Sequence, residues 1–564
     1  MVNYETDVLV IGGGGAGAMA AYEASKHGVT VTMVLKGLPQ RSGSTIMAPG
    51  AIAGAGDWHV EGDSKDVHFS DTIKGGSYLN EQRLVRILVE ESPQLILELE
   101  DIGALWQRDE SGGNYALRID GGHSFPRCPY LEDRTGREMV RTLFGEIEKR
   151  HVKILPNIMI LKLLKEGEQI AGAVGLNLET SEPVLIRAKS IILACGGAGN
   201  LYLNTSNPTD VTGDGYALAL DAGAALMDME FVQFFPLGFL YPKSLRGALA
   251  ALLYYVHLLN NKGERFMEKY DPNRLELSTR DKVARAIFTE IKEGRGGPNG
   301  GIFADMTYQE PGFIAKMQPA LYETYGKIGI NPETDLLEVA PTCHFFMGGA
   351  KVDENWQTTV LGLFAAGENA AGIQGANRLS QNALAELLVS GARTGKAAAK
   401  YANEKDSYCP IDPKIVKQYT KHAESMLARE SGIRPTELRT MLRTLMWDKV
   451  GIFRIDGNLR EAIQGLAELK SKLNQQYVSL KSKRLNLELR EGLENYFLIS
   501  VAQCIAEAAI LRTETRGAHF RDDYPSTDNR NWLRHLLIRY KSEGLEVESV
   551  PVDLGEITPE EVAH

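Results

Sequence analysis

A cluster of glycines near the N-terminus lies directly between an apolar segment and an alanine-rich segment. Residues 6–11 read TDVLVI, residues 12–17 read GGGGAG and residues 18–28 read AMAAYEASKHG. Apolar and β-branched residues favour a strand, and alanines suit a helix that packs closely on a sheet. Residues 29–35, VTVTMVL, predict a second strand. This order of strand, glycine turn, helix and strand predicts a parallel β-α-β unit and an α/β fold class.

Three of the glycines have the spacing GxGxxG, which gives each of them a separate task. The first turns the chain, the second lets the backbone approach a pyrophosphate, and the third lets the helix meet the sheet. The helix N-terminus adds amide hydrogens and a positive dipole end. We therefore predict dinucleotide binding by Gly12, Gly14, Gly15, Ala16 and Gly17. The second strand ends in Leu35 and Lys36, where an acidic residue for the ribose hydroxyls is expected.

Length and charge narrow the class of protein further. A chain of 564 residues is longer than one hydrophobic core usually organises, so several domains are expected. The net charge of −11 argues against nucleic-acid binding, which needs clustered basic surface. The five cysteines are far apart and form no CxxC pair, so we predict no disulfide framework and no metal site. The N-terminus has no basic signal region and no apolar run reaches about 18 residues, so we expect no membrane span.

Changes in composition along the chain predict its domain organisation. Residues 1–233 form the first part of a Rossmann-like domain, and residues 347–405 return to strand, glycine turn and helix and complete it. Residues 234–346 carry aromatic runs, a glycine-rich loop and few strand signals, which indicates an inserted α+β capping domain. Residues 406–564 are mostly helical and form a C-terminal helical domain and tail.

Ten segments, taken in order, resemble one known family. They are HFSDTIKGG (68–76), GGHSFPR (121–127), DRTGREM (133–139), ACGGAG (194–199), TGDGYALALDAGAALMDMEFVQ (212–233), NNKGERFMEKY (260–270), CHFFMGG (343–349), GLFAAGE (362–368), GANRLSQNALAEL (375–387) and RGAHFRDDYP (516–525). Together they resemble the flavoprotein subunit of the succinate dehydrogenase and fumarate reductase family. That family includes L-aspartate oxidase and the adenylylsulfate reductase flavoprotein, and its second strand also tends to end in lysine.

The resemblance implies that the Rossmann-like domain binds FAD. Glu368 is then expected to hold a flavin-side hydroxyl, and Asp214 to line the cofactor. The helix that starts near Asn382 is expected to point its N-terminus at the isoalloxazine, where a positive end stabilises the reduced flavin. Further cofactor residues expected from the resemblance are Lys36, Ser44, Thr45, Gly50, Arg378 and Leu384.

The resemblance also predicts that FAD is bound without a covalent bond. Covalent members of the family attach FAD through a histidine just after a Pro-x-Arg-Ser run. The corresponding segment here is PQRSGST (39–45), with Gly43 and Ser44 in that place.

In the family, two histidines and an arginine hold the substrate carboxylates, and a second arginine moves the proton opposite the flavin. His344 in CHFFMGG and Arg378 in GANR match one histidine and one arginine of that set. The alternatives are a buried histidine that bonds only the backbone and an arginine that pairs with the cofactor phosphates. We predict that both residues contact a small acid-like substrate.

Two other positions depart from the family pattern. Where the family reads EFVQxHPTG, this chain reads EFVQFFPLG, with Phe235 and Leu237 in place of the histidine and threonine. Leu252 or a neighbour stands where the family has the arginine of RGEGG. Arg246 belongs to the nearest RG pair and becomes our catalytic candidate for the proton. Other candidate acids are Tyr254, Tyr255 and His257.

These departures leave one carboxylate clamp and an otherwise apolar pocket. An unpaired buried charge costs on the order of several kcal/mol, so a second carboxylate would bind poorly. A monocarboxylate, a larger unsaturated acid or thioester, or the nucleotide-sulfur chemistry of adenylylsulfate reductase would fit better than fumarate.

The resemblance implies an FAD-dependent oxidoreductase that exchanges two electrons with an organic acid-like substrate and with an iron-sulfur protein subunit. We expect the chain to be cytoplasmic or held at a membrane through partner subunits. The alternative from another class is a flavin electron-transfer subunit whose substrate pocket is vestigial.

Overall fold

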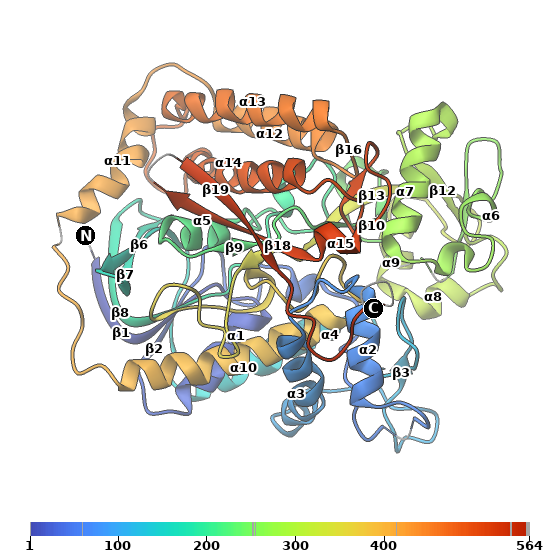
Figure 1. The fold of residues 1–564 in the computed structure, drawn as a ribbon, viewed down its shortest axis with the longest axis horizontal. Helices are drawn as coiled ribbons and strands as arrows, with labels where there is room; N and C mark the ends of the chain where they lie inside the picture. Colours follow the sequence, from blue (N-terminus) through green and yellow to red (C-terminus); the bar gives the residue numbers. More distant parts are fainter. Residues whose placement is uncertain are drawn as a thin grey trace.

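A computed structural model describes residues 2–58, 60–250, 253, 255–412, 414–541 and 544–559 (Figure 1). Its largest sheet has the strand order β5-β2-β1-β8-β7-β6, with β15 also pairing with β8. β1, β2, β5, β8 and β15 run parallel where they pair, whereas β6, β7 and β8 are antiparallel neighbours. The strands are β1 (Val2–Ile11), β2 (Val31–Val34), β5 (Lys153–Leu155), β6 (Ile158–Glu166), β7 (Gln169–Asn177), β8 (Pro183–Leu193) and β15 (Leu363–Ala365). The predicted β-α-β unit is present, and the α/β class is confirmed.

Small residues let two helices pack closely beneath this sheet. α1 (Gly15–Ser25) follows the glycine turn and lies against α10 (Asn382–Asn403). A Cβ on Gly391 would lie 2.8 Å from the Ala16 carbonyl oxygen, and one on Gly395 would lie 2.4 Å from that of Ala20. Because both distances are too short for a side chain, the close approach of the helices depends on glycine. Other helices of this part of the chain are α2 (Lys65–Gly75), α3 (Gln82–Asp101), α4 (Thr135–Lys149) and α5 (Asp214–Asp221).

A second, antiparallel sheet with its own core forms a cap at one end of the molecule, on the right of Figure 1. Its strand order is β10-β13-β12-β11. Buried Phe239, Leu258, Ile287 and Val339 belong to that core, which is separate from the core around the large sheet. The elements are β10 (Val232–Phe239), β11 (His257–Leu259), α6 (Met267–Tyr270), α7 (Arg280–Glu290), β12 (Ile302–Asp305), α8 (Phe313–Met317), α9 (Pro319–Gly326) and β13 (Leu337–Phe346).

Helices and a β-hairpin make up the C-terminal part. The helices are α11 (Ile415–Ala428), α12 (Pro435–Lys449), α13 (Asp456–Lys472), α14 (Leu487–Leu511) and α15 (Asn529–Trp532). The hairpin strands β18 (Arg534–Lys541) and β19 (Gly544–Pro551) join β9 (Leu226–Met227) and β14 (Gly349–Ala350) in a third sheet. The tail of the chain is therefore fixed to the Rossmann-like domain by strand pairing. Short two-stranded pairs are formed by β3 (Leu117–Arg118) with β4 (Cys128–Pro129), and by β16 (Phe453–Arg454) with β17 (Phe520–Arg521).

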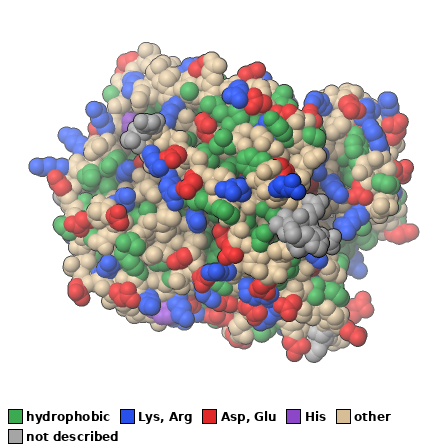
Figure 2. All heavy atoms as spheres, viewed as in Figure 1, with side chains coloured by type: hydrophobic (Ala, Val, Ile, Leu, Met, Phe, Trp, Pro, Cys, Tyr) green, Lys and Arg blue, Asp and Glu red, His purple; other side chains and the backbone are tan. Residues whose placement is uncertain are grey.

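One described helix, α14, is long and apolar enough to cross a membrane by length and composition. Its apolar window is 67% buried against the rest of the protein, however. A helix that is apolar on all sides and packed within a domain is typical of a core helix. Acidic and basic side chains are interspersed over the face drawn in Figure 2.

Candidate active site

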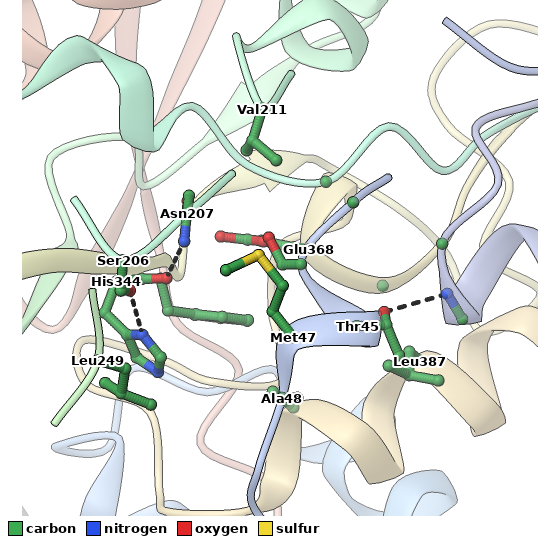
Figure 3. Close-up of a pocket in the computed structure, with 18 of the residues that line it drawn as sticks. Thr45, Met47, Ala48, Ser206, Asn207, Val211, Leu249, His344, Glu368 and Leu387 are labelled. Atoms are coloured by element: carbon green, nitrogen blue, oxygen red, sulfur yellow. Dashed lines mark hydrogen bonds between the residues drawn. The ribbon is translucent and has the colours of Figure 1, made fainter. Parts of the chain in front are cut away.

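A cavity of about 530 Å³ runs from the glycine turn of the large sheet to the inner face of the cap. Its wall combines residues of the Rossmann-like domain with residues of the cap. Figure 3 shows Thr45 and Leu387 toward one side of it, and Ser206, His344 and Leu249 toward the other. Of the predicted site residues, the following line it: Gly12, Gly14, Gly15, Ala16, Lys36, Ser44, Thr45, Gly50, Asp214, His344, Glu368, Arg378 and Leu384.

The glycine turn has the geometry that a pyrophosphate needs. Gly12 has a φ of 117°, and a Cβ there would lie 2.1 Å from the carbonyl oxygen of Ala194. Gly17 does not line the cavity, but a Cβ on it would lie 2.2 Å from the Gly12 carbonyl oxygen, so it serves the packing of helix on strand. The Thr45 hydroxyl accepts a hydrogen bond of 3.1 Å from the Gly15 amide. The N-terminal end of α1 thus lies at the cavity, where phosphate binding requires it.

Lys36 is the residue at the end of the second strand, where an acid is usual. Its ammonium group lies 2.8 Å from Asp214 and 3.0 Å from Glu494, and it donates to the Thr212 hydroxyl at 2.6 Å. Burial alone would lower the pKa of Lys36, but the two carboxylates outweigh it and the pKa is raised. Lys36 is therefore a fixed cation that ties the strand end to Asp214 in the cavity wall.

Glu368 and the start of α10 form the middle of the wall. The Glu368 carboxylate accepts a hydrogen bond of 2.9 Å from the Phe346 amide, and burial raises its pKa to about 7. α10 begins at Asn382, where the sequence predicted a helix start. The Asn382 side chain lies outside the cavity wall, because it contacts His68 Nε2 at 2.9 Å and donates to the Thr72 hydroxyl at 3.0 Å. Leu384 of the first turn does line the cavity.

His344 lies at the cap end with one ring nitrogen already engaged. Its Nδ1 is 2.8 Å from the Ser206 hydroxyl, and Asn207 donates to its backbone carbonyl at 3.0 Å (Figure 3). Burial, with Arg378 and Arg280 nearby, holds the pKa of His344 well below its usual range. The imidazole is consequently neutral, and Nε2 is the nitrogen left for a ligand.

Arg378 is a buried guanidinium beside this histidine. It is 6% exposed, and its Nε has no hydrogen-bond partner among the described residues. Burial and the nearby Arg280 lower the pKa of Arg378 to about 9, so it remains a cation at neutral pH. Gln233 donates to the Arg378 carbonyl at 3.0 Å and holds its loop in place. An unpartnered buried N–H is costly, which indicates that a ligand completes the site.

Arg280 is the site residue that sequence reasoning missed. It is the first residue of α7, lines the cavity, and donates from Nη2 to the Ser380 hydroxyl at 2.7 Å. Its Nη1 is buried and finds no partner in the described part of the chain. A cation at the N-terminal end of a helix is disfavoured by the helix dipole. That unfavourable placement, readable in the segment STRDKVARAI, was the available signal.

The predicted proton candidates are placed differently. Arg246 is exposed, lies outside the cavity wall, and donates from Nε to Asn204 at 2.9 Å. His257 is stacked on Tyr308, with ring centroids 3.9 Å apart, and is also outside the wall. Tyr255 lines the cavity, and burial raises its pKa. Leu252 and Tyr254 lie outside the described residues.

Glu386 gives the protein a pH-dependent stability. This buried carboxyl of α10 accepts a hydrogen bond of 2.7 Å from Gln374, and burial raises its pKa to about 8. Its stabilising contribution is complete below the unfolded pKa of 4.5 and is lost as pH rises through 8, at about 1.4 kcal/mol per pKa unit. We expect Glu386→Gln to unfold at a higher temperature than the wild type at pH 8.5 but not at pH 4.5. The measurement is the thermal midpoint across that range.

Glu404→Gln, an exposed change at the other end of the same helix, is the control and should leave the slope unchanged. If the thermal midpoint of Glu386→Gln changed with pH as steeply as that of the wild type, Glu386 would not be the source of the pH dependence.

Comparison with known proteins shows which family has this fold and cavity. The family model for the FAD binding domain matches residues 7–384, and that for the fumarate reductase flavoprotein C-terminus matches residues 439–563. The chain belongs to the fumarate reductase and succinate dehydrogenase flavoprotein family. The family resemblance and the FAD cofactor predicted from the sequence are thereby confirmed.

Individual relatives of this flavoprotein cover nearly all of it. A fumarate reductase (CoM/CoB) subunit of Methanothermobacter marburgensis is 43% identical over 543 residues, 96% of this chain and 98% of that protein. The fumarate reductase flavoprotein subunit of Mycobacterium tuberculosis is 34% identical, with 98% of each chain covered. The structure of quinol fumarate reductase from E. coli superposes with a TM-score of 0.92 at 30% identity, covering 99% of this chain and 98% of that one. Adenylylsulfate reductase of Archaeoglobus fulgidus, at 22% identity and a TM-score of 0.80, shares the fold.

Membership in the family settles the class of activity. The flavoprotein is an FAD-dependent oxidoreductase that resembles fumarate reductase and succinate dehydrogenase. The cavity fits the cofactor, because it joins the glycine turn predicted to hold the pyrophosphate to a wall that includes the Ser44 hydroxyl, which is buried and has no hydrogen-bond partner among the described residues.

Proposed function

We propose that this flavoprotein reduces the carbon-carbon double bond of an unsaturated carboxylic acid, using electrons that an iron-sulfur protein delivers to non-covalently bound FAD. The observation that carries the proposal is the convergence of His344, Arg378 and Arg280 at the cap end of the FAD cavity. Two of the three are guanidinium groups with a buried N–H that has no partner within the described part of the chain, and a carboxylate would satisfy both.

The protein residues have distinct tasks in this proposal. His344 Nε2 and Arg378 bind the substrate carboxylate, while Ser206 fixes the orientation of the imidazole through Nδ1. When bound and reduced, FAD would supply a hydride, that is, two electrons and one proton, for the β carbon. Arg280 would give a proton from its guanidinium to the α carbon, and solvent would return a proton to Arg280. The double bond would thus become a single bond.

Arg280 is favoured over Arg246 as the proton donor by its position. Arg280 lines the cavity and acts electrostatically on both His344 and Arg378, whereas Arg246 is exposed and engaged with Asn204. These N–H groups also argue against a vestigial pocket, because a disused site has no reason to keep on each of two arginines a buried nitrogen without a partner among the described residues.

The test is anaerobic reoxidation of the reduced flavin. The purified protein is reduced chemically, and fumarate, crotonate or cinnamate is then added while the flavin absorbance is followed. We expect at least one acid to reoxidise the flavin far faster than buffer does, and acid precipitation to release FAD into solution. Failure of every unsaturated acid, with stable FAD, would contradict the proposal and leave the electron-transfer alternative.

The iron-sulfur partner is supported by the names of relatives, which are described as subunits. No CxxC pair occurs in this chain, so a cluster must come from another protein.

A further inference from the structure

The cap end of the cavity has two different halves. One carries the charged and polar side chains, and the other carries mostly apolar side chains. His344 and Arg280 both lie against Phe235, which stands where the family pattern has a histidine. The Phe235 ring centroid is 5.5 Å from that of His344, and the Arg280 Cζ is 4.9 Å from the Phe235 ring. The Ser380 hydroxyl accepts from Arg280 and lies two residues after Arg378. His344, Arg378 and Arg280 thus lie close enough to act electrostatically on one another, as the donors for one carboxylate would.

The other half of the cap end is mostly apolar. Figure 3 draws Leu249 on the same side of the cavity as His344, and the Phe235 ring contacts both the His344 ring and the Arg280 guanidinium. The apolar side chains that line this half are Phe235, Phe239, Leu245, Ala248, Leu249, Leu253, Leu321 and Tyr325, and the polar residues Gln318 and Thr324 also line the cavity. The Tyr325 hydroxyl donates to the Tyr241 carbonyl at 3.1 Å, so it does not present a free donor.

This apolar wall is held in place by backbone pairing. The Gly247 amide donates to the Phe239 carbonyl and the Ala250 amide to the Leu237 carbonyl, each at 2.8 Å. Gly238 and Leu249 form a β-bridge. Gly247 has a φ of 84°, and a Cβ there would lie 2.5 Å from the Thr205 carbonyl oxygen. Because the backbone of this segment pairs with β10, the position of Leu249 in the cavity wall is fixed.

The remaining cations of the described wall are already occupied. Lys36 is paired with Asp214 and Glu494 at the far side of the glycine turn. Arg118 donates to the Glu132 carbonyl at 2.9 Å and lies 3.9 Å from the Tyr130 ring. A second carboxylate placed against the apolar half would be buried with no cation to pair with among the described residues, which is unfavourable.

We infer that the substrate is an α,β-unsaturated monocarboxylate whose β carbon carries an apolar group. This inference rests on the proposed function and assigns its substrate class. The carboxylate lies among His344, Arg378 and Arg280, and the apolar group lies against Phe235 and Leu249. The chemistry balances as before: one hydride from reduced FAD, one proton from Arg280, and a saturated monocarboxylate as product.

The experiment compares crotonate and cinnamate with fumarate as oxidants of the reduced holoenzyme under anaerobic conditions. We expect kcat/KM at least tenfold higher for one of the two monocarboxylates than for fumarate. Phe235→His places a cation-capable group in the apolar half and should shift that ratio at least tenfold toward fumarate. Phe288→His, on α7 but outside the cavity wall, is the matched control and should leave the ratio unchanged.

A binding measurement needs no variant and covers the case in which Phe235→His fails to fold. Butyrate and 3-phenylpropionate should perturb the absorbance of the oxidised flavin at lower concentration than succinate does. Tighter binding of succinate would overturn the inference.

The outcomes separate the inference from the proposed function. If fumarate is the best oxidant of the wild type, double-bond reduction stands and the monocarboxylate inference fails. Loss of that fumarate activity in Arg118→Gln would place the second carboxylate on Arg118. If none of the three acids reoxidises the flavin, the proposed function fails and the inference fails with it.

Discussion

Replacement of Arg280 by glutamine is expected to lower kcat for an unsaturated acid by about 10²- to 10⁴-fold, the usual contribution of a general acid. Glutamine keeps a donor for the Ser380 hydroxyl, which Arg280 contacts at 2.7 Å, but it cannot release a proton at neutral pH. FAD content should be unchanged, because Arg280 lies at the cap end of the cavity, away from the glycine turn. The measurement is single-turnover reoxidation of the reduced flavin, with acid-released FAD measured in parallel.

The matched control is Arg285→Gln on the same helix. Arg285 pairs with Asp281 at 3.0 Å and does not line the cavity, so its loss should cost turnover less than twofold. Arg280→Lys, which restores a cation with a releasable proton, should recover part of the rate. A fully active Arg280→Gln together with an inactive Tyr255→Phe would instead assign proton transfer to Tyr255, the remaining candidate acid in the wall.

Gly12→Ala is expected to abolish tight FAD binding. The new Cβ would lie 2.1 Å from the Ala194 carbonyl oxygen, and the φ of 117° is one that alanine avoids. Backbone must therefore move at the point where β1 and β8 meet the phosphate-binding turn. We expect FAD affinity to fall by at least 100-fold and the protein to purify without its yellow colour. The measurement is FAD titration followed by flavin fluorescence.

Gly28→Ala is the control for this change. Gly28 also has a positive φ, 69°, but a Cβ there meets nothing within 4 Å. It should cost some stability through backbone strain while FAD affinity stays at the wild-type level. Equal loss of FAD in both variants would show that strain in the domain, and not the collision with Ala194, governs binding.

Secondary-structure elements that depend on residues close together in the sequence could be predicted. The strand, glycine turn and helix at residues 6–25 depend on neighbours in sequence, as does the helix that begins at Asn382. The position of Lys36 and the grouping of His344 with Arg378 came from motif matches, and the structure brings these residues to one cavity.

The features that could not be predicted depend on contacts between residues far apart in the sequence. The spacing from NNKGERF predicts the proton donor among residues 246–257. In the structure, α7 brings Arg280 into the cavity from a later point in the chain. Nothing near Arg280 in sequence indicates that Phe235 and Ser380 will be its neighbours. The hairpin of β18 and β19 was likewise missed, because β18 is stabilised by pairing with β9, whose Leu226 lies about 310 residues before its partner Ile538.

The separate core of the cap has a consequence for the timing of proton delivery. Arg280 is carried by the cap, whereas Arg378, Ser380 and the glycine turn belong to the Rossmann-like domain. Since each part buries its own apolar residues, the joint between them can open without unfolding either. Opening would withdraw Arg280 from Ser380 and from the rest of the site. Proton delivery by Arg280 would therefore require the arrangement seen here, with the cap closed over the cavity.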